Sequence, residues 1–230
     1  QKFNVLLHYL LKKKKQTLII TTLNKTKFQM AQKSKQWAAI IMMIALFAMI
    51  AFVTNLCSPM ATIVKNQFGA SELAGQIGNY ANFIAYLVMG IPSGMLIAKL
   101  GYKKTALLAL IVGIVGIVFE YLSGVVGSYV IYLVGAFISG LCMCMLNTVV
   151  NPLLNVLGGG GKTGNQLIQI GGAANSAAAV AVYILMGALI GEVTKSTGIS
   201  DATPALIIAG VIFVIAFVIL LFTKLEEPEQ

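Results

Sequence analysis

Long uncharged blocks alternate with short charged segments along most of the chain. No Lys, Arg, Asp or Glu occurs in residues 36–64, 73–98, 105–119, 121–161, 163–191 and 202–223. A helix needs about 20 mostly apolar residues to cross the hydrocarbon core of a bilayer. The pattern therefore predicts six transmembrane helices, at about 37–64, 73–98, 105–122, 129–156, 165–190 and 204–222.

The composition excludes an ordinary soluble domain. Of the 230 residues, 58% are hydrophobic and 10% are charged, and the mean hydropathy is +0.90. Soluble domains are about 45–50% apolar and about 25% charged. A chain of this size cannot bury so much apolar surface by itself, so we expect the lipid bilayer to cover it. The predicted fold class is an all-α integral membrane protein.

The placement of the lysines predicts an orientation in the membrane. The net charge is +9, from sixteen lysines, no arginine and seven acids. If both termini are cytoplasmic, the cytoplasmic segments after residue 29 carry Lys33, Lys35, Lys99, Lys103, Lys104, Lys162 and Lys224, and the outer loops carry Lys65 and Lys195. Cytoplasmic loops are enriched in lysine, so we expect a multi-pass membrane protein with both termini in the cytoplasm. No basic and aromatic residues alternate as stacking on bases requires, so nucleic acid is not an expected partner.

Residues 1–29 differ in composition from the rest. They contain no Gly, Ala, Asp or Glu, whereas all 23 glycines lie in residues 30–230. The four missing residue types have codons that begin with G, and the segment carries runs such as Lys12–Lys15. We hypothesise that this is a non-native upstream extension and that translation starts at Met30. The alternative is a disordered basic arm that binds anionic lipid.

An internal repeat divides the predicted helices into two triplets. Residues 76–82 match residues 169–175 at five of seven positions, and the same shift of 93 places Pro59 on Pro152. Because each triplet has three helices, the second crosses the membrane in the opposite sense. Inverted repeats of three plus three helices are typical of secondary transporters.

Amides and hydroxyls gather on the first, second, fourth and fifth predicted helices. Lipid does not accept such groups unpaired. For any one of them, a hydrogen bond to a neighbouring helix is an adequate explanation. For the set, which shares its helices with Pro59 and Pro152, a polar substrate cavity is favoured. The predicted substrate-binding residues are Asn55, Ser58, Gln76, Asn79, Asn147, Asn151, Gln169 and Asn175.

Other candidate motifs point away from catalysis. No nucleophile, base and acid occur together, so we expect no enzyme, no metal site and no cofactor. The glycine-rich run at 158–161 lacks the spacing of a phosphate-binding loop and is interpreted as a turn. Glu120 is expected to anchor a loop at the outer end of the third helix. Two GxxxG pairs, at 90–94 and 187–191, are expected to mark close helix packing.

These motifs resemble the major facilitator superfamily and, within it, the fucose permease and glucose-galactose transporter branch. The resemblance rests on the loop after Ile91-Pro92-Ser93, on Asn147-Thr148-Val149-Val150-Asn151-Pro152 and on Asn175-Ser176. It covers residues 37–223, which match the first six of the family's twelve helices. It implies a fold of two six-helix halves, of which the C-terminal half is a missing partner, and residues 224–230 begin the cytoplasmic linker.

Two departures from the branch concern proton coupling. The resemblance implies an aspartate and a glutamate at positions that are Ser58 and Asn147 here. Neither an amide nor a hydroxyl titrates in the physiological range, so proton coupling through these sites is not expected. The expected function is transport of a small polar solute, in first place a sugar, by alternating access. The alternatives are a self-pairing six-helix half-transporter and an inactive truncated bundle.

Overall fold

The computed structural model describes residues 37–56, 58–69, 71–191, 194 and 196–223. The chain divides into two units, Gln1–Ala38 and Ala39–Gln230, and the account below concerns the second. The predictions for residues 1–29 lie outside the described residues. The predicted linker at 224–230 lies outside them as well.

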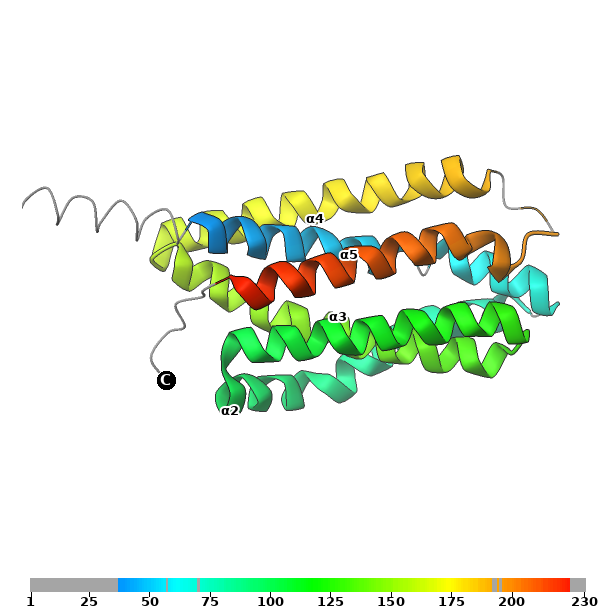
Figure 1. The fold of residues 1–230 in the computed structure, drawn as a ribbon, viewed down its shortest axis with the longest axis horizontal. Helices are drawn as coiled ribbons and strands as arrows, with labels where there is room; N and C mark the ends of the chain where they lie inside the picture. Colours follow the sequence, from blue (N-terminus) through cyan, green and yellow to red (C-terminus); the bar gives the residue numbers. More distant parts are fainter. Residues whose placement is uncertain (1–36, 57, 70, 192–193, 195, 224–230) are drawn as a thin grey trace, which may run out of the picture. The chain divides into compact units, whose positions relative to one another are not determined.

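Helices make up nearly all of the described part of the second unit (Figure 1). The first helical segment is Trp37–Phe68, within which position 57 is not described. It is followed by α2 (Glu72–Val126), α3 (Tyr129–Leu157), α4 (Gly161–Ile190), the short 3-10 helix η1 (Ile199–Ala202) and α5 (Thr203–Phe222). The described residues contain no strand, which agrees with the predicted all-α class.

Five helices in the described ranges have the length and apolar composition needed to cross a membrane. The predicted spans at 129–156, 165–190 and 204–222 correspond to α3, α4 and α5 within four residues at each end. The predicted spans at 73–98 and 105–122 both fall in α2, which is 55 residues long. The predicted count of six is therefore not confirmed as a count of helices.

Gly101 interrupts α2 and divides it into a first arm (72–100) and a second arm (102–126). Its backbone is non-helical, with φ 82° and ψ 170°, a conformation that favours glycine. A straight helix of this length would measure about 80 Å. Yet the Tyr129 hydroxyl, just beyond the end of α2, donates a hydrogen bond of 2.6 Å to the carbonyl of Ala74 near its start. The arms therefore run in opposite directions, as the reversal of the α2 ribbon shows (Figure 1).

Most lysines of the described unit lie at one end of the helix bundle. Lys103, two residues after the reversal at Gly101, donates hydrogen bonds of 2.8 Å to the carbonyls of Leu221 and Thr223 at the end of α5. The loop between α3 and α4 lies at this end too, and Lys162 follows it in the first turn of α4 (Figure 1). We call it the lysine end.

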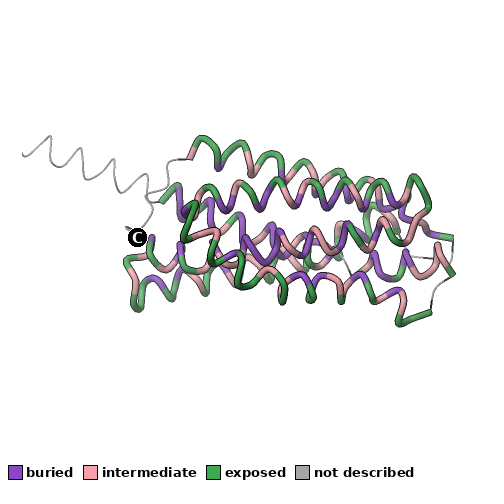
Figure 2. The backbone as a smooth tube through the Cα atoms, turned by 90° about the horizontal axis from the view of Figure 1, so that it is seen from below, coloured by how far each residue is buried: buried purple, intermediate pink, exposed green. Residues whose placement is uncertain are grey.

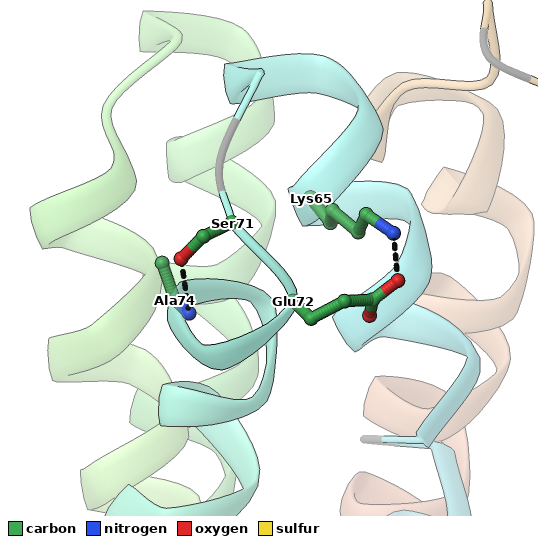
Figure 3. A network of polar contacts seen from close by, with 4 residues as sticks. All are labelled: Lys65, Ser71, Glu72 and Ala74. Atoms are coloured by element: carbon green, nitrogen blue, oxygen red, sulfur yellow. Dashed lines mark hydrogen bonds and ion pairs between the residues drawn. The ribbon is translucent and has the colours of Figure 1, made fainter.

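The opposite end is held by contacts of the first helical segment. Lys65 forms an ion pair with Glu72, and the Ser71 hydroxyl caps α2 by accepting a hydrogen bond from the Ala74 amide (Figure 3). The neighbouring Asn66 donates to the carbonyl of Thr194 at 2.8 Å. These bonds connect the first segment to the start of α2 and to the chain between α4 and α5.

Small residues bring the second arm of α2 close to α3. A Cβ atom on Gly116 would lie 2.5 Å from the hydroxyl of Ser139, and one on Gly135 would lie 2.8 Å from Glu120 Cγ. In this interface the Ser139 hydroxyl donates to the carboxyl of Glu120, which is buried. The expectation that Glu120 anchors a loop is therefore wrong, because its carboxyl bonds a residue of a neighbouring helix.

The two GxxxG pairs do not pack against helices of this chain. A Cβ atom on Gly90, Gly94, Gly187 or Gly191 would meet no atom within 4 Å. The expected close packing is thus absent from the described residues at these four positions. Figure 2 shows that buried residues gather where the helices face one another, while exposed positions continue along every helix.

Candidate functional site

A cavity of about 580 Å³ lies between the first helical segment and the first arm of α2. Its lining carries no charge and combines hydroxyl, amide and aromatic side chains: Thr54, Ser58, Gln76, Asn79, Tyr80, Asn82, Phe83 and Tyr86. Of the eight residues predicted from the sequence, Ser58, Gln76 and Asn79 line it. We call this the polar cavity.

The spacing of helical residues explains how the lining assembles. Thr54 and Ser58 are four residues apart, and Gln76, Asn79, Phe83 and Tyr86 follow at intervals of three and four, so each set occupies one helix face. Thr54 and Ser58 are exposed within this chain, as are Tyr80 and Phe83. The rings of Tyr80 and Phe83 are 50% and 70% exposed, so a bound molecule has direct access to aromatic surface.

Gln76 and Asn79 form an amide pair in the cavity wall. Asn79 Nδ2 donates a hydrogen bond of 2.6 Å to Gln76 Oε1. Each amide carries two donor hydrogens and one acceptor oxygen, so this bond leaves both a donor and an acceptor on the pair. Neighbouring donors and acceptors of this kind suit the adjacent hydroxyls of a polyol or sugar.

Asn147 of α3 does not line the cavity but bonds Tyr86, which does. Its Nδ2 donates a hydrogen bond of 2.8 Å to the Tyr86 hydroxyl, and both residues are half-buried. On the same side of α3 the Thr148 hydroxyl lies 3.0 Å from that of Ser93. Two side-chain hydrogen bonds, Asn147 to Tyr86 and Thr148 to Ser93, therefore join α3 to the first arm of α2.

The other predicted residues have partners elsewhere. Asn55 and Asn151 each donate to a carbonyl one turn earlier in their own helix, at Ala51 and Asn147. Asn175 of α4 donates to the carbonyl of Phe47, a bond of 2.9 Å between two helices. The bond of Asn175 is the interhelical pairing that the sequence left open as an alternative, whereas those of Asn55 and Asn151 lie within their own helices.

Gln169 lies in a separate cavity on α4. That cavity measures about 730 Å³ and is lined by Lys162, Asn165, Gln166, Gln169 and Ile170. Its residues belong to the first three turns of α4, near the lysine end. The structure thus does not place Gln169 with Gln76, although the two occupy equivalent positions in the sequence repeat.

The eight predicted binding residues leave out five residues of the lining: Thr54, Tyr80, Asn82, Phe83 and Tyr86. Phe83 shares the predicted helix face of Gln76 and Asn79, and Tyr86, three residues further on, extends that face. The aromatic residues were passed over because large apolar side chains are common on lipid-facing surfaces as well. Asn82 is buried beside Gly140 of α3, a contact that no pattern in the sequence indicates.

The polar cavity is suited to binding an uncharged polar molecule. No carboxylate, lysine or histidine lines it, and no group of three or more His, Cys, Asp or Glu that could hold a metal occurs among the described residues. Amides and hydroxyls supply hydrogen bonds, and aromatic faces supply apolar contact. The lining therefore provides hydrogen bonds and apolar contacts for a bound molecule, but no nucleophile with an adjacent general base.

Comparisons with known proteins identify a transporter family. The sequence model of the Major Facilitator Superfamily matches residues 38–230. The chain is 23% identical, over 186 residues, to a glucose/galactose transporter of Brucella abortus, an alignment that covers 80% of this chain and 45% of that protein. It is 27% identical, over 114 residues, to the L-fucose-proton symporter of Escherichia coli, covering 50% of this chain and 26% of that protein. These relatives are transporters, not enzymes, and they agree with the branch that the sequence motifs indicated.

A solved structure supports the same fold. The structure resembles a crystal structure of the Escherichia coli fucose:proton symporter with a TM-score of 0.67 at 20% identity. The match covers 83% of this chain and 50% of the solved chain. The chain therefore spans about half the length of the proteins it matches. At this identity the likeness shows the fold.

Proposed function

Because the chain belongs to the Major Facilitator Superfamily, we propose that it forms one half of a transporter for a small polar solute, in first place a sugar. The observation that carries this proposal is the polar cavity, whose lining of amides, hydroxyls and aromatic rings bears no charge. Such a lining suits hydroxyl-rich, uncharged molecules. The names of the relatives, a glucose/galactose transporter and a fucose symporter, favour a monosaccharide.

The proposed membrane arrangement has six crossings in two inverted triplets. The two antiparallel arms of α2 each have the length of a membrane span, so five helices supply six crossings. Gln76 and Gln169, equivalent in the repeat, lie near the starts of α2 and α4, which are at opposite ends of the bundle. Equivalent residues are expected at opposite depths in the membrane when the two triplets of helices cross it in opposite directions.

The proposed orientation places the lysine end in the cytoplasm of a bacterial cell. Lys99, Lys103, Lys104 and Lys162 belong to the two connections at that end, whereas Lys65 belongs to the opposite one. An excess of lysine in cytoplasmic loops sets the orientation of multi-pass proteins. Both termini then lie inside, and the polar cavity begins near the outer ends of the first segment and α2.

A second six-helix half is the proposed partner. Gln169 of α4 is exposed in this chain, and hydrocarbon does not readily accept an exposed amide. Gly90 and Gly187 have open space where a Cβ atom would stand. Small residues allow another helix to approach closely. The exposed amide on α4 and the open glycine positions on α2 and α4 favour a covering protein surface over lipid.

Two alternatives remain for the covering surface. The first is a second copy of this chain, which would make a self-pairing half-transporter. The second is the absence of any partner, which would leave an inactive bundle inserted in the membrane. In the proposed transporter the halves rock against each other around the cavity, so the solute meets one side of the membrane at a time.

We propose that transport is not coupled to protons through Ser58 or Asn147. Ser58 lines the cavity and Asn147 bonds its Tyr86, so both stand where a coupling group would meet the solute. Neither side chain takes up or releases a proton at physiological pH. Uncoupled transport down the gradient of the solute is the simplest mechanism that Ser58 and Asn147 support.

Uptake by proteoliposomes tests the proposed function. Vesicles that contain the purified 230-residue chain are supplied with radiolabelled D-glucose, D-galactose or L-fucose, at several pH values and with or without sodium. The proposal expects saturable binding of at least one sugar without dependence on pH or sodium, and saturable uptake would show in addition that copies of this chain pair to form a transporter. Uptake that equals that of protein-free vesicles would exclude a self-sufficient transporter, and a failure to bind any of the three sugars would contradict the sugar site itself.

A further inference from the structure

Two tyrosines line the polar cavity, and one of them is tied to a second helix. The hydroxyl of Tyr86, on the first arm of α2, accepts a hydrogen bond of 2.8 Å from Asn147 Nδ2 of α3. One turn further along α3, Asn151 Nδ2 donates a hydrogen bond of 3.0 Å to the backbone carbonyl of Asn147. Tyr86 is half-buried, and its backbone carbonyl accepts a further contact from Cys144 Sγ at 3.7 Å. Side chains of α3 therefore contact Tyr86 at both its backbone carbonyl and its hydroxyl.

The direction of the bond to Asn147 determines what the Tyr86 hydroxyl can offer. A phenolic hydroxyl carries one hydrogen and can also accept hydrogen bonds. An amide nitrogen is only a donor, so Asn147 Nδ2 occupies an acceptor position on the Tyr86 oxygen. The hydrogen of the phenol consequently turns away from Asn147. Because Tyr86 lines the cavity, a bound solute is a partner within its reach.

We propose that Tyr86 is a specificity-determining residue, which donates a hydrogen bond to one hydroxyl oxygen of the sugar, and that Asn147 is the residue that positions it. The inference rests on the proposed function of the polar cavity. It adds that the sugar hydroxyl at this point is recognised as an acceptor. Neither Asn147 nor Tyr86 changes its protonation between pH 5 and 8, so the selection is independent of pH in that range.

The amide at position 147 is essential to this polarity. A carboxylate in its place would accept the hydrogen of the phenol. The Tyr86 oxygen could then only accept a hydrogen bond from the sugar, so it would select a sugar hydroxyl that donates. The amide therefore does more than stabilise the helix pair, since it determines whether the sugar hydroxyl is recognised as a hydrogen-bond acceptor or as a donor.

Deoxy and deoxyfluoro sugars test the proposal directly. The parent sugar is the one of D-glucose, D-galactose and L-fucose that the unmodified chain binds most tightly. Each hydroxyl is replaced in turn by hydrogen, which neither donates nor accepts, or by fluorine, which accepts only. A hydroxyl that accepts from Tyr86 will tolerate fluorine better than hydrogen. We expect the fluoro analogue to bind about three- to tenfold tighter than the deoxy analogue at one ring position, the range of a single neutral hydrogen bond.

The variant Tyr86→Phe removes only the phenolic oxygen. We expect the ratio of fluoro to deoxy affinity at that ring position to fall to about one, while the other positions keep their ratios. Tyr121→Phe is the matched control, because Tyr121 lies on the second arm of α2 and outside the cavity lining. It should leave every ratio unchanged.

A double-variant comparison separates positioning by Asn147 from a structural role. Asn147→Ala frees the phenol to rotate, so it should reduce the ratio in the unmodified chain and have no further effect on it in the Tyr86→Phe background. A ratio that survives Tyr86→Phe would overturn the role of Tyr86, and one that survives Asn147→Ala would overturn the role of Asn147. If the unmodified chain binds none of the three sugars, the proposed function fails first and the inference fails with it.

Discussion

The Ser139 hydroxyl donates a hydrogen bond of 2.9 Å to Oε1 of Glu120, and the two side chains are buried between the second arm of α2 and α3. Gly116 and Gly135 allow the approach, since a Cβ atom on either would collide with this pair. Glu120 does not line the polar cavity. Its carboxyl therefore serves the packing of two helices.

Glu120→Ala is expected to destabilise the protein without abolishing sugar binding. The change leaves the Ser139 hydroxyl without its acceptor and opens a void, at a cost of about 1–3 kcal/mol. Glu120→Gln keeps an acceptor oxygen of the same reach, so its cost should be less than about 1 kcal/mol. Thermal unfolding in detergent measures both. Equal effects of the two substitutions would contradict a stabilising contribution of the Glu120 side chain to this interface.

Asn147→Ala is expected to weaken sugar binding while membrane insertion stays intact. Loss of the amide that fixes Tyr86 should reduce affinity about three- to tenfold, the effect of one neutral hydrogen bond. Asn155→Ala is the control, because Asn155 lies on the same side of α3 but bonds Asn165 at the lysine end. Binding of a radiolabelled sugar to the purified variants measures the effect. Unchanged affinity of Asn147→Ala would remove Asn147 from the site.

Asn147→Glu is expected to introduce a dependence on pH. A carboxyl beside Tyr86 can exist in two charge states, whereas the amide has only one. We expect uptake or binding by the variant to change several-fold between pH 5.5 and pH 8, and that of the unmodified chain to change less than about twofold. A profile as flat as that of the unmodified chain would contradict the inference that position 147 governs proton coupling.

Lys103→Ala is expected to loosen the end of α5. The Lys103 ammonium donates to the carbonyls of Leu221 and Thr223, the groups that a helix leaves unpaired at its C-terminus. Its loss should cost about 0.3–1 kcal/mol. Amide hydrogen exchange in the last turn of α5 should become faster, whereas the exposed neighbour Lys104, changed to Ala, should leave it unchanged. Equal exchange in both variants would contradict the capping role.

The helices could be predicted from the sequence more fully than the site. Charged residues interrupt the apolar blocks, so the ends of α3, α4 and α5 fall within four residues of their predicted positions. The continuity of α2 was not predictable, because Gly101 ends one arm and starts the next without a loop. In the site, the half-buried amides Gln76 and Asn79 were identified by their spacing. The partners of Asn55 and Asn175 are backbone carbonyls, and a sequence does not show which carbonyl a side chain will reach.

Protection of an introduced cysteine tests the central claim, that the polar cavity binds a sugar. Ser58→Cys is made in a Cys57→Ala background, and Cys142 and Cys144 are buried and so shielded from a membrane-impermeant thiol reagent. Ser58 is exposed in the cavity lining. Ser128→Cys, at the start of α3 and outside the lining, is the control. The rate of labelling is measured with and without D-glucose, D-galactose or L-fucose.

The account predicts that at least one of these sugars slows labelling at position 58 in a saturable manner and leaves labelling at position 128 unchanged. Labelling at position 58 that proceeds at the same rate at every concentration of all three sugars would contradict it.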